Sequence, residues 1–474
     1  MNTKLLKQKI LDLAIRGKLT QQLKSDGTAL DLLKQISEQK RESSSTLSSP
    51  RRRGSSSAQS EKTIIPLDKN EAPFEIPANW EWVRLGDVCD DIFAGGDKPL
   101  VCTKEKTESN LIPVYANGIE NDGLYGFTNV ARVTKKAITI SARGTIGFSC
   151  VRELPFVPIV RLLTVIPFYH LVDLKYLKAV FDILLNVGEG SSIPQLTVPT
   201  IRIFVFPLPP LAEQQRIVEK IQEAFAEIDS IENNKELLKT HIKQARQKIL
   251  DLAIHGKLVL QNKADEPASV LLERITRDNP HYEKIENEPF EIPENWAWVR
   301  INDIASDMAD GPFGSNLKAE HYTDKKEARI IQLSNIAENG WKDENVRYTT
   351  FEHAKKNISR SIVEAGNLVI AKMMPAGRAM ICPSTEKMYV LSSDAVKLVP
   401  IDEINNQFLC YAINSPYFKA QVNGNIQGTT RLRTSISKLR ECLLALPPLA
   451  EQSRIVAKIE ELFSTLDQME RNVV

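Results

Sequence analysis

The sequence lacks the features that mark several large classes of protein. Its six cysteines include no Cys-x-x-Cys pair, which argues against zinc ribbons and disulfide scaffolds and favours a reducing cytoplasm. No apolar run approaches the roughly 20 residues of a membrane-spanning helix, and the N-terminal segment carries no secretion signal. With 61 Lys plus Arg against 60 Asp plus Glu, the net charge of +1 provides no uniform attraction for nucleic acid. These absences predict a cytoplasmic protein without a membrane partner.

Recognisable catalytic patterns are missing as well. The sequence has no GxxxxGK[ST] phosphate loop, no HExxH zinc motif and no GxSxG nucleophile elbow. Its six histidines are dispersed, and it has no Asn/Asp-Pro-Pro-aromatic loop of the kind expected in a methyltransferase that acts on amino groups. We therefore predict that the chain has no catalytic residue, no metal site and no cofactor of its own.

What the sequence does contain is a duplication. Three segments occur twice, and the copies pair as 8–19 with 247–258, 73–88 with 289–304, and 208–221 with 446–459. The copies are identical at 11 of 12, 11 of 16 and 12 of 14 positions, with offsets of 239, 216 and 238 residues. Two copies at so long a period do not make a solenoid. We expect a two-repeat ring that is opened within one helix, with Met1 and Val474 close together.

The segment that separates the two copies is predicted to be one long helix. Residues 211–258 contain no proline and a single glycine, Gly256, and their apolar residues recur at spacings of three, four or seven. This is typical of a coiled coil, and its partner would be the split second copy, 5–15 and 449–469. The polar run Glu232–Lys235 (ENNK) interrupts the apolar stripe, so we expect the coil to loosen there. Two helices packed in a core would share this geometry, but the length favours a spacer rod.

The regions between the helical segments diverge almost completely after a shared start. Short apolar runs predict strands at 137–140, 159–166, 201–206, 329–333, 367–371 and 395–399. Helical patterns are fewer, at 171–185 and 405–420. We predict an α+β fold, with two mixed α/β domains related by pseudo-two-fold symmetry and separated by a long antiparallel helical coiled coil. The predicted parts are a repeated helix at 1–19, a linker with a disordered Ser/Arg-rich part at 20–72, a first domain at 73–207, a central long helix at 208–258, a second linker at 259–288, a second domain at 289–445 and a final helix at 446–474.

The loops of the two variable domains carry groups that suit base edges and phosphates. Corresponding Gly-hydroxyl-hydroxyl segments lie 18 residues before each LPPLAEQ, and Asn, Arg or Lys follows several predicted strands. Glycine and hydroxyl groups allow close approach to phosphate, while Arg can bond guanine and Asn or Gln adenine. Ordinary turns and solvated strand ends explain the same residues about equally well. The candidate DNA-binding residues are Asn117, Arg143, Thr145, Ser191, Ser192, Gln195, Ser315, Asn316, Lys318, Asn335, Lys372, Arg378, Thr429, Thr430, Arg431 and Arg433.

Two variable domains, each closed by LPPLAEQ at 208–214 or 446–452, together with KILDLAIxGKL helices, resemble the DNA specificity subunit of type I restriction-modification systems. The segments DGPFGSNLK at Asp310 and SARGTIG at Ser141 are also similar to strand–loop elements of that family. The resemblance covers essentially the whole chain apart from 43–62. It implies that each variable domain is a target recognition domain for one half of a bipartite sequence in double-stranded DNA, and that the paired helices set the gap.

The resemblance also implies partners that carry the chemistry. Two modification subunits would hold S-adenosylmethionine and methylate adenine, and restriction subunits would use ATP and Mg. The paired helices would dock the modification subunits, and the candidate partner-binding residues there are Leu211, Ile217, Ile221, Leu449, Ile455 and Ile459.

Two other functions stay open at this point. A coiled-coil scaffold that joins two protein-binding domains would have no DNA affinity. A nuclease fused to its own reader would need an acidic metal cluster, which the sequence does not display. DNA reading instead predicts salt-sensitive binding whose sequence preference changes when one domain is exchanged.

Overall fold

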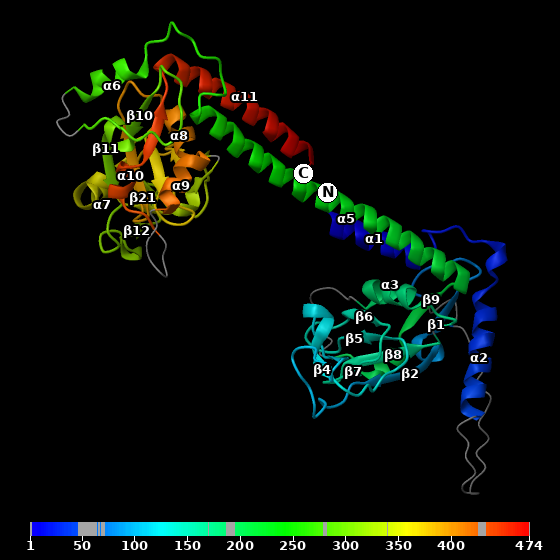
Figure 1. Ribbon diagram of the computed structural model, residues 1–474. Coiled ribbons are helices and arrows are strands. Elements are labelled where there is room, and N and C mark those ends of the chain that lie inside the picture. Colours follow the sequence, from blue (N-terminus) through cyan, green and yellow to red (C-terminus); the bar gives the residue numbers. More distant parts are fainter. Residues whose placement is uncertain are drawn as a thin grey trace. The chain divides into compact units, whose positions relative to one another are not determined.

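The computed structural model describes residues 2–45, 64, 67, 72–168, 170–185, 195–277, 282–338, 340–424 and 433–473. They divide into two compact units, Met1–Asn234 and Lys235–Val474. The long helix α5 (Leu211–Ile254) contributes its first part to one unit and its last part to the other (Figure 1).

The division between the units falls within the polar run Glu232–Lys235, where we expected the coil to loosen. The backbone of α5 stays helical through this run. The polar residues therefore mark a change of partner helix and not a break in α5. Met1 and Val474 lie outside the described residues, so their proximity stays a prediction.

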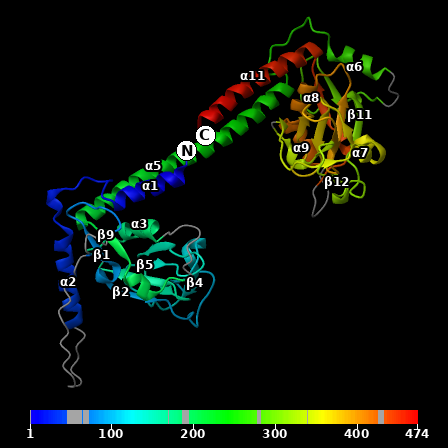
Figure 2. The same cartoon turned by 180° about the vertical axis from the view of Figure 1, so that it is seen from behind.

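In the first unit, α1 (Thr3–Ile15) packs antiparallel to the first part of α5 (Figures 1 and 2). Leu11 and Ile15 are buried in the same hydrophobic cluster as Ile217. Lys7 forms an ion pair with Asp229, and its ammonium group lies 5.6 Å from the centre of the Phe225 ring. We call this helix pair the stalk of the first unit.

The stalk of the second unit is built in the same way from α11 (Leu449–Val473) and the last part of α5 (Figures 1 and 2). Arg246 forms an ion pair with Asp467, and its guanidinium lies 4.9 Å from the centre of the Phe463 ring. These residues follow Lys7, Asp229 and Phe225 at the offsets of the sequence repeat. The duplication therefore extends from the sequence to the contacts between the helices.

Each unit carries a four-stranded antiparallel sheet with the same strand order. In the first unit the order is β2 (Cys89–Ala94), β8 (Leu163–Pro167), β5 (Ala137–Ile140) and β6 (Ser149–Arg152). In the second it is β11 (Ala305–Asp310), β21 (Ala395–Pro400), β18 (Leu368–Ala371) and β19 (Ala379–Ile381). A helix follows the corresponding strand in each, α3 (Leu174–Leu184) or α8 (Asn406–Ile413), and its apolar face enters the core.

A second sheet in each unit contains one parallel strand pair. In the first unit β3 (Ile112–Tyr115) lies between β4 (Leu124–Thr128), which is antiparallel to it, and β7 (Val157–Pro158), which is parallel to it. In the second, β13 (Ala328–Ile331) lies between β16 (Tyr348–Thr349) and its parallel neighbour β20 (Tyr389–Leu391). The second unit adds β12 (Tyr322–Thr323) and β17 (Ile362–Val363) at the edges. The two variable domains therefore have the same topology, although their sequences have diverged.

The remaining helices and strands also fall largely into corresponding pairs. Strand β1 (Glu81–Arg84) pairs with β9 (Val205–Leu208), and β10 (Ala297–Arg300) pairs with β22 (Leu443–Leu446). The other elements are α2 (Ala29–Ser45), α4 (Val198–Arg202), α6 (Ala268–Thr276), β14 (Ile336–Ala337), β15 (Gly340–Trp341), α7 (Phe351–Asn357), α9 (Pro416–Gly424) and α10 (Ile436–Arg440).

The repeated motifs meet at one junction between stalk and domain. In the first unit the carboxylate of Glu213, from LPPLAEQ, accepts hydrogen bonds from Trp80 Nε1 (2.9 Å) and Gln22 Nε2 (3.0 Å). In the second, Glu451 accepts them from Trp296 Nε1 (3.1 Å) and Gln261 Nε2 (2.7 Å). Both glutamates are fully buried, and burial raises the pKa of Glu451. In each unit the glutamate of LPPLAEQ thus binds the first tryptophan of the repeated segment 73–88 or 289–304, which explains why these segments recur together.

Two expectations about local structure need correction. The predicted linker 20–72 contains the helix α2, since Leu32 and Ile36 on one of its faces are buried in the core, and the linker 259–288 contains α6. The predicted strand 201–206 begins instead within α4, whose start is capped by the hydroxyl of Thr197. Short apolar runs do not distinguish such a helical turn from a strand.

Candidate nucleic-acid interface

Five loop segments of each unit meet at one end of its four-stranded sheet, and we call them the recognition edge. In the first unit the edge consists of 95–101, 116–118, 141–147, 159–162 and 195–197, and in the second of 311–318, 332–335, 372–378, 392–395 and 433–435. Backbone bonds relate the two edges position by position. Leu196 N donates to Ala142 O (3.1 Å) as Thr434 N does to Lys372 O (2.9 Å). Gln195 therefore occupies the position that Arg433 has in the second unit.

Four predicted site residues come together at the first edge. Arg143 Nη2 donates to Gln195 Oε1 over 2.8 Å, and both side chains are exposed or half-buried. The hydroxyls of Thr145 and Ser141 lie 3.0 Å apart. Asn117 accepts a hydrogen bond from Ala142 N (2.8 Å) and so anchors the loop that carries Arg143.

The side chain of Asn117 is bonded within the recognition edge. Its Nδ2 donates to Val160 O over 2.8 Å, while its Oδ1 receives the bond from Ala142 N. Both ends of the amide are thus occupied within the chain. Asn117 joins three segments of the recognition edge and supports this surface, and its contact with DNA stays a prediction.

Sequence reasoning missed an exposed arginine at the first edge. Arg161 lies in a turn in which Val160 and Arg161 both adopt left-handed conformations, with φ of 53° and 60°. Val160 N and Arg161 N donate to Gly96 O and Gly95 O, each over 2.9 Å, which holds the turn against the loop after β2. Residues 159–166 had been assigned to one strand, and an unbroken strand would have concealed this turn. The residues of this apolar run do not indicate a turn at Val160–Arg161.

At the second edge two of the predicted basic residues are paired with carboxylates. Lys372 Nζ lies 2.5 Å from Asp310 Oδ1, and Arg433 Nη2 lies 3.3 Å from Asp394 Oδ1. The backbone of Lys372 also donates to Asp394 O over 2.9 Å. Asp310 is the last residue of β11 and opens the segment DGPFGSNLK, but sequence reasoning did not single out its side chain, and Asp394 precedes β21 without a motif around it. They leave this part of the edge with balanced charge.

The loop after β11 presents several predicted residues on a fixed backbone. Gly311 permits its path, because a Cβ there would lie 1.8 Å from Ser392 O. His353 Nε2 lies 2.8 Å from Asn316 O and holds the far side of the loop. The exposed side chains are Phe313, which is 84% exposed, and the predicted contacts Ser315, Asn316 and Lys318.

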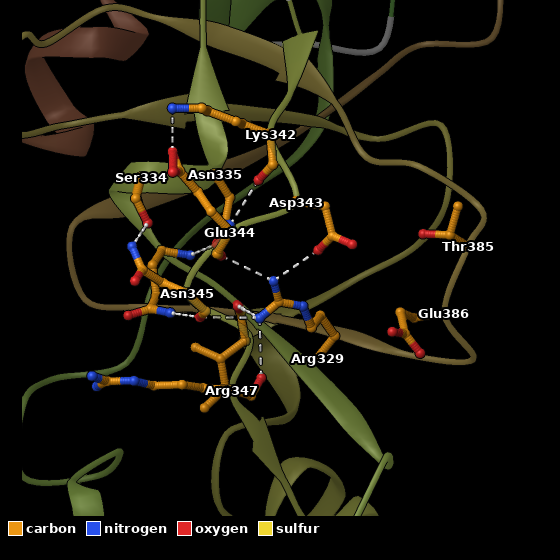
Figure 3. A network of polar contacts seen from close by, with 12 residues as sticks. Arg329, Ser334, Asn335, Lys342, Asp343, Glu344, Asn345, Arg347, Thr385 and Glu386 are labelled. Carbon is orange, nitrogen blue, oxygen red and sulfur yellow. Dashed lines mark hydrogen bonds and ion pairs between the residues drawn. The ribbon is translucent and has the colours of Figure 1, made fainter. Parts of the chain in front are cut away.

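Asn335 was predicted to read bases, and the structure assigns it a different role (Figure 3). Its side chain is fully buried; Nδ2 donates to Lys342 O (2.9 Å) and Glu344 O (2.6 Å), and Oδ1 accepts from Gln332 N (2.8 Å). With no exposed surface, the amide cannot meet a base edge. Asn335 instead holds the loop 342–345 in place.

The buried Arg329 supports the same loop from the sheet (Figure 3). Its side chain is 1% exposed; it forms an ion pair with Asp343 at 3.1 Å and donates to Glu344 O at 3.2 Å. In the first unit Arg152 does similar work from β6, since it donates to Asp122 O and lies against the ring of Tyr115. Among the described residues of each domain, one buried arginine thus anchors a loop.

The remaining predicted site residues are placed less directly. Arg378 is half-buried, its Nε donates to Pro375 O over 2.9 Å, and burial lowers its pKa. Its role in DNA binding stays a prediction. Ser191, Ser192, Thr429, Thr430 and Arg431 lie outside the described residues.

Most of the predicted partner-binding residues are used inside the chain. Ile217, Ile221, Ile455 and Ile459 are buried in the hydrophobic cores that join stalk and domain, so they cannot offer a surface to a partner. They were chosen for their apolar helical spacing, which an internal core also produces. Leu449, which is 44% exposed, and the half-buried Leu211 stay candidates for docking.

Neither a metal site nor a membrane span is found where the structure describes the chain. No group of three or more His, Cys, Asp or Glu side chains is arranged to hold a metal among the residues described. No described helix is long and apolar enough to cross a bilayer.

Comparison with known proteins finds a match over most of the chain. Residues 77–240 and 293–474 both match the family "Type I restriction modification DNA specificity domain". The chain is 25% identical to the type I restriction enzyme EcoAI specificity subunit of Escherichia coli, over 98% of this chain and 90% of that protein. The EcoEI specificity subunit of E. coli is 23% identical with the same coverage. A chain in a solved structure on the assembly and conformational transition of a type I R-M system superposes with a TM-score of 0.56 at 16% identity, covering 85% of this chain and 94% of that one.

Proposed function

The chain belongs to the family of type I restriction-modification DNA specificity proteins, and we propose that each of its variable domains reads one half of a bipartite target in double-stranded DNA. The domains would read through the two recognition edges. Phosphate contacts would position the edges on the duplex, and contacts to base edges would provide the sequence preference.

One observation carries this proposal. The two units have the same topology and the same junction contacts, yet corresponding positions of the recognition edges hold different groups. Gln195 and Arg433 correspond, as do Ala142 and Lys372. A constant scaffold with variable polar groups at one edge is suited to reading two different short sequences with one fold.

The stalks would have two further tasks. They would set the distance between the two half-sites, and each would help to dock one modification subunit at equivalent surfaces of the two units. The modification subunits would bind S-adenosylmethionine and methylate adenine, and restriction subunits would use ATP and Mg. This division of labour is supported by the duplicated stalk contacts, Lys7 with Asp229 and Arg246 with Asp467, since equivalent surfaces suit two copies of one partner.

The proposal is tested by expressing the full chain with its modification subunits in a host that lacks other adenine methylation. Sequencing of modified bases should reveal one interrupted motif, and exchange of residues 73–207 for those of a relative should change one half of that motif only. Binding by the purified complex should weaken steeply with salt. A scaffold without DNA recognition predicts no motif and no salt-sensitive binding, and either result would contradict the proposal.

A further inference from the structure

The backbone bonds at the recognition edges define corresponding positions that exchange their residue types. Leu196 N and Thr434 N donate to Ala142 O and Lys372 O, so position 195 corresponds to 433 and position 143 to 373. Arginine stands at 143 in the first unit and at 433 in the second, while Gln195 and Met373 occupy the other two places. The pair 143/373 has its arginine in the first unit, and the pair 195/433 has its arginine in the second unit.

Each of these arginines has an acceptor beside its guanidinium. In the first unit Arg143 Nη2 donates to Gln195 Oε1 over 2.8 Å. In the second, Arg433 Nη2 lies 3.3 Å from Asp394 Oδ1, an oxygen that is buried and accepts no hydrogen bond from the described residues. Residues Met373 and Arg433 also form an antiparallel bridge, which fixes the backbone under the side chain.

We propose that Arg143 and Arg433 each read a guanine, and that Gln195 and Asp394 are positioning residues that orient their guanidinium groups. This inference rests on the proposed function of DNA recognition. The planar guanidinium can donate two parallel hydrogen bonds to O6 and N7 of guanine in the major groove. In each unit the acceptor lies beside one edge of the guanidinium, which leaves the other edge for such a bidentate contact.

The charges around Arg433 favour a base edge over a phosphate. Arg433 is 45% exposed, and the carboxylate of Asp394 stands beside it. Asp310 lies next to Lys372, whose backbone is bonded to Asp394. Together the two carboxylates balance the charges of Lys372 and Arg433, so a phosphate gains little net attraction here, whereas the guanine edge is uncharged and offers two acceptors.

The experiment uses the full chain assembled with its modification subunits and a library of DNA duplexes with two randomised blocks separated by spacers of several lengths. Selected sequences are compared for the wild type and for Arg433→Lys, Arg433→Ala, Arg143→Lys and Arg143→Ala. We expect the Arg433 variants to lose about 10- to 100-fold discrimination at one G·C pair of one half-site. The Arg143 variants should show the same loss in the other half-site only. Lysine keeps the charge but not the two-pronged geometry, so it should not restore the preference.

Substitution of 7-deazaguanine for the guanine in question gives an independent measurement. It removes the N7 acceptor, so it should weaken binding by the wild type and leave binding by Arg433→Ala unchanged. Arg274→Ala is the matched control, because this arginine lies on α6, pairs with Glu266 and Glu403, and belongs to none of the segments of the recognition edge. The control should select the wild-type sequence.

The positioning residues are tested through the same preference. Asp394→Asn should reduce discrimination at the base pair affected by Arg433→Lys, and the double variant should lose no more than Arg433→Lys alone. Gln195→Ala should act in the same way on the pair affected by Arg143→Lys. Substitutions that only destabilised the fold would instead reduce binding at every position of the half-site.

The outcomes separate this inference from the proposed function. If the wild-type complex selects an interrupted sequence but the arginine variants weaken binding to all duplexes equally, the arginines contact phosphate and the guanine assignment is wrong. The same conclusion holds if their preference is unchanged. If the wild type selects no sequence, DNA recognition itself fails.

Discussion

The two recognition edges have the same backbone framework but differ in the charge of the groups beside their basic side chains. The first places Arg143 and Arg161 at its surface, and its acceptor beside Arg143 is the neutral Gln195. The second pairs Lys372 and Arg433 with Asp310 and Asp394. The comparison teaches that the framework bonds use backbone atoms and a few buried side chains, so the exposed positions are free to change. This separation allows one fold to recognise unrelated sequences.

The largest expected effect concerns the close approach of Gly311 to Ser392 at the second recognition edge. In Gly311→Ala the new Cβ would lie 1.8 Å from Ser392 O, and backbone would have to move. We expect a loss of at least about 3 kcal/mol in the free energy of unfolding of the second unit, measured by denaturant titration. Gly314→Ala is the matched control, because nothing lies within 4 Å of its Cβ. Equal stability of the two variants would show that the loop after β11 is not constrained as described.

A second expected effect distinguishes a residue that supports a loop from a residue that contacts bases. Asn335→Ala removes a buried amide that makes three hydrogen bonds, and it leaves Lys342 O and Glu344 O without those donors. We expect it to cost about 2–3 kcal/mol in the free energy of unfolding. Asn117→Ala, which removes three hydrogen bonds at a partly exposed site, should cost less. A variant of Asn335 with normal stability and altered sequence preference would contradict the supporting role.

The sequence predicted long helices and regular strands better than the turns and short helices between them, for a physical reason. Periodicity identified α5, α3 and the strands β5, β18 and β21, since each buries a regular apolar pattern. It did not identify the turn at Val160–Arg161 or the helix α4, because short apolar runs fit several backbone shapes. At the edges, Arg143, Gln195, Lys372 and Arg433 were predicted because glycine or a Gly-hydroxyl-hydroxyl segment lies near them in the sequence. Their partners Asp310 and Asp394 were missed because they are far away in the sequence from the side chains that they contact.

The junction between stalk and domain allows a prediction about pH. Burial raises the pKa of Glu451 in the folded state above its value in the unfolded state. The folded state therefore binds the proton more tightly, and the free energy of unfolding falls as the pH rises from the unfolded-state pKa through the folded-state pKa. Glu451→Gln keeps a side-chain acceptor without the buried charge and should remove this part of the pH dependence. Glu451→Ala should cost about 1–3 kcal/mol at any pH, because Trp296 Nε1 loses its acceptor. The measurement is thermal unfolding of both variants from acidic to neutral pH, and a steeper fall for Glu451→Gln than for the wild type would contradict the assignment.

The smallest expected effect compares the two stalks directly. Lys7 and Arg246 occupy corresponding positions, each paired with an aspartate and each beside a phenylalanine ring. Lys7→Arg should be nearly neutral, and Arg246→Lys should cost less than about 1 kcal/mol, because Lys keeps the charge but stacks less well on Phe463. Both variants are checked by the free energy of unfolding at low and high salt. The contribution of the ion pair to this free energy should decline at high salt by a similar amount in the two units. Because the two contacts lie at the same point of the duplicated helix pairs, a large cost in one unit alone would mean that the stalks, and not only the recognition edges, have diverged in function.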